Sequence, residues 1–134
     1  MKAIRLHDMK RGSLAFDLRD ILAALGPQAV KAVWRVGDVE VESEALMMAT
    51  GNGADELEKL AKLGMLVSGE RLIEIARNVD QIIWGEFKGY DSASSADPWI
   101  VVVAFDSTWF EVRSTDDLAL ARLEVAFKDV RPLS

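Results

Sequence analysis

Hydrophobic residues recur every three or four positions in four stretches of the chain, which is the spacing of amphipathic helices. The first stretch runs from Leu14 to Leu25, and Gly26-Pro27 predicts its end. Either Ser13 or Asp17 can serve as its N-cap, because both side chains accept hydrogen bonds from free backbone N–H groups. We expect residues 1–12, ahead of this helix, to form a mobile N-terminal segment.

Each of the three later helices is predicted by its own N-terminal cap. Asp55 and Glu58 have the spacing of a capping box, and Gly64 predicts the C-terminal end of the same helix. Ser68 and Ser114 are the predicted caps of the other two. The apolar positions expected to face the core are Leu57, Leu60 and Ala61, then Leu72, Ile75, Ala76 and Val79, and finally Leu118, Ala121 and Val125.

Alternating apolar and charged residues between the first two helices predict a strand over Val30 to Val36. Gly37-Asp38 could turn this strand into a hairpin with Arg35 opposite Glu40, because glycine suits the first central position of a two-residue turn. Residues 38–50 could instead begin a helix near Ser43. The sequence leaves both alternatives open.

The last third of the chain is rich in β-forming residues and predicts three consecutive strands. These strands cover Gln81–Tyr90, Trp99–Phe105 and Thr108–Arg113, with a polar hairpin loop at 91–98 between the first two. Consecutive strands with short connections form an antiparallel meander. The predicted fold is therefore a single α+β domain over residues 1–134, in which the meander and the N-terminal strand or hairpin carry about four helices on one face.

Side chains alternate between the two faces of a strand. A two-residue turn at Asp106-Ser107 would set the register of the strands before and after it, and so determine which of their side chains share a face of the sheet. One face would hold the core residues Trp99, Val101, Val103, Phe105, Phe110 and Val112, together with Ile83 and Phe87. The opposite face would hold Ile100, Val102 and Ala104, and with them the six candidate binding residues Trp84, Glu86, Lys88, Trp109, Glu111 and Arg113.

Composition and charge narrow the classes of function. The chain has no cysteine, so disulfides, thiolate nucleophiles and zinc-thiolate sites are excluded. Its net charge of −6 and its scattered Lys and Arg argue against a nucleic-acid partner. The longest strongly apolar run, Trp99 to Phe105, is far too short to cross a bilayer, and the N-terminus lacks the layout of a secretory signal. We therefore expect a soluble cytoplasmic protein with no membrane partner.

The motif Asp106-Ser107-Thr108 follows an apolar strand and could carry chemistry or only a turn. A phosphatase nucleophile of the haloacid dehalogenase type needs a second acid two residues later, where Thr108 stands. No GxxxxGK[ST] loop is present, and a serine nucleophile would have only His7 as its base. Asp and Ser both favour turns, so we predict a hairpin tip.

Other polar motifs have structural explanations. The segment TGNGADE, 50–56, lacks the third glycine of a dinucleotide loop and is typical of a loop before a helix. Glu40, Glu42 and Glu44 lack a converging fourth ligand, which favours a solvated face over a metal site. Four carboxylates could converge as a general acid and base only if the fold brought them together: Glu86, Asp91, Asp106 and Glu111. We predict no cofactor and no metal.

The sharpest functional indication is the face with the two tryptophans Trp84 and Trp109, because tryptophan is enriched at binding hot spots. We expect a non-catalytic interaction protein, adaptor-like or immunity-like, that binds a protein partner or forms a homodimer through this face. Another element, such as the first helix or the 30–43 hairpin, could instead cover it. The alternative function is a small-molecule-binding protein or hydrolase whose acid, Asp106 or Glu86, lies at the helix/sheet junction.

Overall fold

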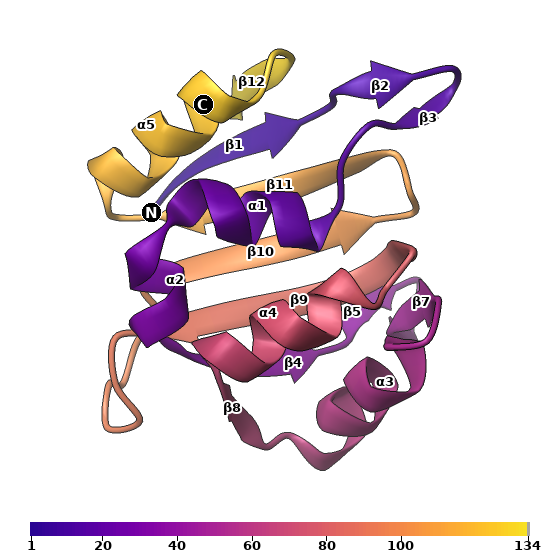
Figure 1. The fold of residues 1–134 in the computed structure, drawn as a ribbon, viewed down its shortest axis with the longest axis vertical. Coiled ribbons are helices and arrows are strands. Elements are labelled where there is room, and N and C mark those ends of the chain that lie inside the picture. The colour runs from indigo at the N-terminus through magenta and orange to yellow at the C-terminus, as the bar shows by residue number, and fades with distance from the viewer. Residues whose placement is uncertain (134) are drawn as a thin grey trace.

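A computed structural model describes residues 1–133 and has the predicted α+β fold, built on an eight-stranded antiparallel sheet (Figure 1). Seven strands follow one another in the spatial order β12 (Val130–Leu133), β1 (Lys2–Leu6), β11 (Trp109–Ser114), β10 (Ile100–Phe105), β9 (Gln81–Tyr90), β4 (Val33–Gly37) and β8 (Leu66–Ser68). The eighth, β7 (Met48–Thr50), pairs with β9 beyond the end of β4. The meander β9-β10-β11 is present as predicted.

Two short hairpins stand outside the main sheet. One is formed by β2 (Met9–Lys10) and β3 (Ser13–Leu14), and the other by β5 (Val39–Val41) and β6 (Glu44–Leu46). Because Ser13 and Leu14 are in a strand, the first helix begins later than predicted.

Helices α1 (Leu18–Leu25), α2 (Pro27–Lys31), α4 (Gly69–Arg77) and α5 (Asp117–Ala126) cover one face of the sheet, here called the inner face (Figure 1). The remaining helix, α3 (Ala54–Leu63), packs beside β4 and β7. The helices bury their apolar sides against Trp34, Phe87 and Phe110, which are almost fully buried. None of the helices within residues 1–133 is long and apolar enough to cross a membrane.

The predicted helix caps are only partly right. Asp17 caps α1 and Ser68 caps α4, as predicted, and Gly64 ends α3 in a left-handed conformation. The N-cap of α3 is Gly53, however, and the predicted capping box at Asp55 is absent. Ser114 does not cap α5; its hydroxyl group donates to the carbonyl oxygen of Trp99 at 2.7 Å and accepts from the N–H of Asp116, which lies before the helix.

Asp116 is the N-cap of α5. Its carboxylate accepts hydrogen bonds from the backbone N–H groups of Leu118 and Ala119 and from Nε1 of Trp99, at 3.0 Å. The hydrogen bond from Trp99 is the main cause that lowers the pKa of Asp116 below its ordinary value. One carboxylate thereby fixes both the start of α5 and the end of the 91–98 loop.

The prediction of a mobile segment over 1–12 is wrong for most of that segment. Residues Lys2–Leu6 form β1, which lies between β11 and β12 and buries Ile4 and Leu6 in the core. The sequence pattern also did not predict β12. The backbone N–H of His7, just after β1, donates to the carbonyl oxygen of Asp129, just before β12, at 2.9 Å. A strand whose partners are more than a hundred residues away along the chain leaves little local signal.

The predicted hairpin turn at Gly37-Asp38 is also wrong. Gly37 ends β4, which pairs with β9 and β8, and the turn comes later, at Glu42-Ser43. Both turn residues have positive φ, at 49° and 72°. The segment 38–50 therefore contains strands, and no helix begins near Ser43.

Helix α5 also turns a different side inward than predicted. Its buried residues are Ala119, Leu120 and Leu123, whereas Leu118 and Val125 face solvent. Seven of the ten residues of this helix are apolar and lie on all of its sides, so periodicity could not identify the buried side.

Candidate functional site

All six predicted binding residues lie on the face of the main sheet opposite the helices, here called the outer face. They stand on the two strands that flank β10, three on each. Trp84 and Trp109 pair with the same β10 residue, Phe105, in the two registers. Glu86 and Glu111 flank Val103 in the same way, and Lys88 and Arg113 flank Val101. The structure thus brings together the six residues that the sequence singled out.

The faces predicted for β10 are wrong, whereas those of its neighbours are right except at Ile83. Ile100, Val102 and Ala104 point into the core, and Val101, Val103 and Phe105 point to the outer face. The cause is the loop after β10, which has three residues, Asp106–Thr108, so that Phe105 pairs with Trp109. On β9, Ile82 takes the core position predicted for Ile83, because a bulge shifts the register there.

The β5–β6 hairpin covers the middle of the outer face. Val39 is buried against Val101 and Val103, and Val41 packs at the edge of the same cluster beside Trp84 and Phe105. The centre of this face is therefore covered, but by the hairpin of residues 39–46 and not by the first helix or by the hairpin expected over 30–43. The two tryptophans remain partly exposed.

Four aromatic rings cross the outer face as one continuous row. His7, directly after β1, stacks on Trp109 with ring centroids 5.7 Å apart, and Trp109 stacks on Phe105 at 5.4 Å. The edge of Trp84 meets Phe105 at 6.2 Å. We call His7, Trp109, Phe105 and Trp84 the aromatic row; all four side chains are partly exposed.

Charged residues beside the aromatic row form ion pairs along the strands. Glu111 accepts from Arg5 at 3.3 Å through Oε1, and its Oε2 lies 3.4 Å from Nε of Arg113. This second contact is an ion pair without hydrogen-bond alignment. The guanidinium of Arg5 also lies 4.8 Å from the ring centre of Trp109, a cation–π distance. Arg5 and His7 belong to this site and were missed, because they lie in the segment predicted to be mobile.

His7 lies among charges of both signs. Burial is the first cause that lowers the pKa of its imidazole below the ordinary value of 6.5, and the positive charges of Arg131 and Arg5 act in the same direction. Asp129 opposes them. The lowered pKa of His7 favours the neutral form of the ring that stacks on Trp109.

The motif Asp106-Ser107-Thr108 is the tip of the β10–β11 hairpin. Asp106 and Ser107 both have positive φ, at 47° and 61°, and the backbone N–H and hydroxyl group of Thr108 both donate to the carbonyl oxygen of Phe105. This tip lies at one end of β10, and Asp91 follows the end of β9 at the other. The four candidate carboxylates therefore do not converge, and no group of three or more potential metal ligands occurs in the described chain.

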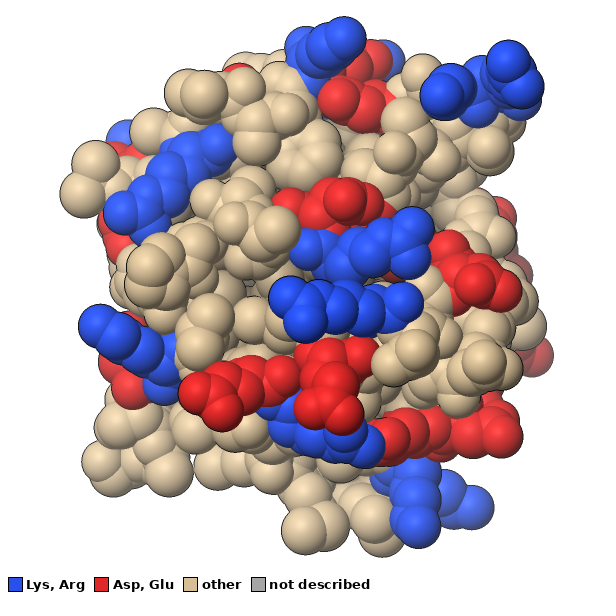
Figure 2. Space-filling model, viewed as in Figure 1, with Lys and Arg blue, Asp and Glu red and all other residues tan. Residues whose placement is uncertain are grey.

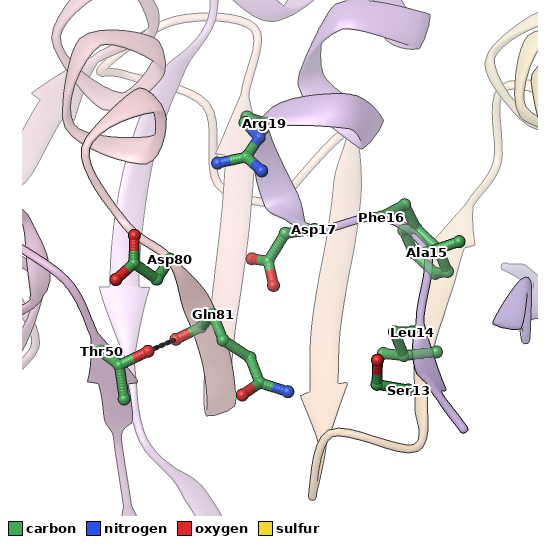
Figure 3. A pocket seen from close by; sticks show the side chains of 9 residues that line it. All are labelled: Ser13, Leu14, Ala15, Phe16, Asp17, Arg19, Thr50, Asp80 and Gln81. Atoms are coloured by element: carbon green, nitrogen blue, oxygen red, sulfur yellow. Dashed lines mark hydrogen bonds between the residues drawn. The ribbon is translucent and has the colours of Figure 1, made fainter. Parts of the chain in front are cut away.

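A separate pocket of about 350 Å³ opens where β3, the start of α1 and the start of β9 meet (Figure 3). Polar side chains dominate it: Ser13, Asp17, Arg19, Thr50, Asp80 and Gln81. Figure 3 shows the carboxyl group of Asp17 pointing into the space between Arg19, Asp80 and Gln81. The pocket lies at a helix/sheet junction, but neither acid that the alternative function named, Asp106 or Glu86, lines it.

Asp17 is only 6% exposed and has a structural role in this pocket. Its Oδ1 accepts from the N–H of Leu18 at 2.8 Å, and its Oδ2 accepts from the N–H of Ile82 at 3.1 Å. Burial raises the pKa of Asp17 to about 6, against the opposite effect of these two hydrogen bonds. The sequence predicted Asp17 as one of two candidate caps, with Ser13, but the contact of Asp17 with Ile82 has no local signal.

Charges of opposite sign lie next to one another across the helix side of the molecule (Figure 2). Arg71, for example, contacts both Glu56 and Glu74. Figure 2 shows no extended basic area on this side, which agrees with the net charge of −6.

Comparison of the chain with protein-family models, with curated proteins and with solved structures finds no match.

Proposed function

We propose that this chain is a non-catalytic interaction protein that binds a protein partner through its outer face. The observation that carries the proposal is the aromatic row, four rings in contact on a face that no helix covers. Large aromatic side chains have few rotatable bonds and lose little entropy on binding, which is why they dominate interface hot spots. Stacking against one another orders these rings further before a partner arrives.

The ion pairs beside the row support a binding surface with a polar rim. Glu111 is held between Arg5 and Arg113, and Glu86 lies 3.5 Å from Nζ of Lys88. Interfaces commonly combine an apolar centre with charged residues at their edge, where the charges contribute to specificity and association rate. The six predicted residues supply both parts.

The β5–β6 hairpin indicates the charge of the partner. Residues 37–47 contain no Lys or Arg, and their four acidic side chains are all exposed: Asp38, Glu40, Glu42 and Glu44. Val39 and Val41 pack this hairpin against the cluster that also contains Trp84 and Phe105. We therefore expect a partner that inserts apolar side chains at the aromatic row and places basic residues against the hairpin.

The test is affinity capture from the native host, followed by calorimetry with the purified partner. We expect Trp84→Ala and Trp109→Ala each to weaken binding at least about tenfold, and the association to weaken as salt rises. Leu63→Ala is the matched control, because Leu63 is an apolar side chain, 57% exposed, on α3. Folded tryptophan variants that bind like the wild type would contradict the proposal. Loss of self-association in these variants, with no other partner, would identify a homodimer instead.

A second candidate function, binding or hydrolysis of a small polar molecule, is supported by the pocket around Asp17. A carboxyl group with a pKa of about 6 can exchange a proton near neutral pH. A compound that raises the melting temperature of the wild type but not of folded Asp17→Asn or Asp80→Asn would favour this function. If no compound in a broad screen of polar metabolites behaves in this way, the result would favour the proposal of a protein-binding function.

A further inference from the structure

Three charged side chains of both signs line the pocket at the start of α1. Asp17 is the N-cap of α1, Arg19 lies in the first turn of that helix, and Asp80 lies in the loop before β9 (Figure 3). None of the three forms an ion pair with another side chain of residues 1–133. Their charges are therefore available to a ligand that enters the pocket.

The buried carboxyl group of Asp17 has acceptor capacity that the fold does not fill. A carboxylate can accept about four hydrogen bonds. The backbone N–H groups of Leu18, Asp20 and Ile82 supply three at most. Burial raises the pKa of Asp17 to about 6, so these donors do not offset the cost of burying its charge. A positively charged N–H donor in the pocket would offset more of that cost.

Arg19 offers the opposite charge at the same pocket. Its Nη1 donates to the carbonyl oxygen of Val79 at 3.1 Å, which holds the side chain beside the pocket. A guanidinium group has five N–H donors, so others remain for an anion, and a carboxylate can take two of them in parallel. Arg19 is thus suited to the acidic group of a ligand.

Asp80 adds a second acid to the lining. Its backbone N–H donates to the carbonyl oxygen of Thr50 at 2.8 Å, which ties the loop that carries its exposed carboxylate to β7. Two acids and one base give the pocket a net negative charge with one positive group at its edge. An anion alone would be repelled by the two carboxylates, and a cation alone would be repelled by Arg19.

We propose that this pocket binds a small zwitterion, with its ammonium group at Asp17 and Asp80 and its carboxylate at Arg19. The proposal rests on the second candidate function, because it names the class of ligand for that pocket, and it does not involve the outer face. The pocket volume of about 350 Å³ lies near the lower end of the range for small-molecule sites, roughly 300–1,000 Å³, and fits a ligand of amino-acid size.

The experiment is isothermal titration calorimetry of the full chain with the common L-amino acids and with glycine, β-alanine and γ-aminobutyrate, at up to roughly 10 mM. The last three differ in the separation of ammonium and carboxylate. Each ligand is compared with its two halves, the amine that lacks the carboxylate and the acid that lacks the ammonium group. We expect at least one zwitterion to bind about tenfold or more tightly than either half.

Substitutions in the pocket test which side chain meets each end of the ligand. Arg19→Gln should reduce the advantage of the zwitterion over the bare amine, and Asp80→Asn its advantage over the bare acid, each at least about tenfold. Both side chains are exposed, so these variants keep the test open if Asp17→Asn does not fold, which circular dichroism checks. Arg71→Gln and Asp97→Asn, exposed residues that do not line the pocket, are the matched controls.

The possible results separate this proposal from the function on which it rests. Binding of a different class of polar compound, lost in Asp80→Asn, would overturn the zwitterion and keep a small-molecule function for the pocket. A chain that binds no zwitterion and no other polar compound would overturn both. Zwitterion binding that is unchanged in Arg19→Gln and Asp80→Asn would also overturn the proposal, because the ligand would then lie elsewhere.

Discussion

Phe105 lies directly opposite Trp109 across the β10–β11 pair, and the two rings stack with their centroids 5.4 Å apart. This pairing exists because the connecting loop contains three residues, Asp106–Thr108. A two-residue loop would pair Phe105 with Thr108, so that Ala104 and not Phe105 would lie opposite Trp109. The loop thus decides the composition of the outer face.

The loop itself provides the first prediction. Asp106 and Ser107 have positive φ, which costs most residues energy and suits Asn and Gly. The double substitution Asp106→Asn and Ser107→Gly should therefore raise the free energy of unfolding by about 1 kcal/mol in urea titrations. Ser94→Gly, in the exposed 91–98 loop, should give no such gain. Loss of partner binding in the doubly substituted chain would contradict a purely structural turn.

His7 and Trp109 provide a spectroscopic prediction. Protonation of an imidazole stacked on an indole quenches the fluorescence of the indole, so emission should fall on acidification with a midpoint below 6.5, because the pKa of His7 is lowered. The unfolded chain takes up this proton first, so His7 reduces stability as pH falls through that range. His7→Gln and Trp109→Phe should both remove the step. A step that persists in His7→Gln would show that another group titrates.

Asp17 predicts a pH dependence of the opposite sign. Its pKa rises from 3.8 to about 6 on folding, so between these values the folded chain holds a proton that the unfolded chain has lost. Stability from this group is therefore present below about pH 4 and decreases as pH rises towards 6, by roughly 2–3 kcal/mol in total. Urea midpoints from pH 4 to 7 should show this decrease in the wild type but not in Asp17→Asn. Asp80→Asn, which changes an exposed carboxylate of the same pocket, should behave like the wild type.

Gly69 predicts a large effect of a single methyl group. The residue is buried at the start of α4, where a Cβ atom would press against the carbonyl oxygens of Ala29 and Val30 in α2. Neither oxygen can move without shifting α2, so Gly69→Ala should lower the free energy of unfolding by about 3 kcal/mol. Glu70→Ala, at the next and exposed position, should change it little. Equal urea midpoints for Gly69→Ala and the wild type would contradict this packing.

The sequence predicted those parts of the fold that local patterns specify. Trp84 and Trp109 were assigned to one face because each lies on a strand with regular alternation. The faces of β10 could not be assigned in this way, because all of its residues are apolar and only the loop length determines its register. The same holds for α5, where Leu118 and Leu120 look alike in sequence and differ only in their tertiary surroundings.

Long-range contacts explain the remaining differences. Arg5 and His7 join the binding surface because β1 pairs with β11. No local sequence pattern near residue 5 indicates this pairing. Asp17 was one of two candidate caps, but its carboxylate also accepts a hydrogen bond from the N–H of Ile82, 65 residues away. The turn at Glu42-Ser43 was missed because neither residue is the glycine or asparagine that its positive φ favours.

The position of β1 between β11 and β12 has a consequence for synthesis on the ribosome. Lys2–Leu6 emerges before both strands that flank it, which lie after residue 108. Until those strands emerge, Ile4 and Leu6 have no strand to join and remain accessible to chaperones. The meander β9-β10-β11 can form earlier, since its connections are short. Completion of the sheet, and with it the placement of His7 on Trp109, is therefore a late step in the maturation of the nascent chain.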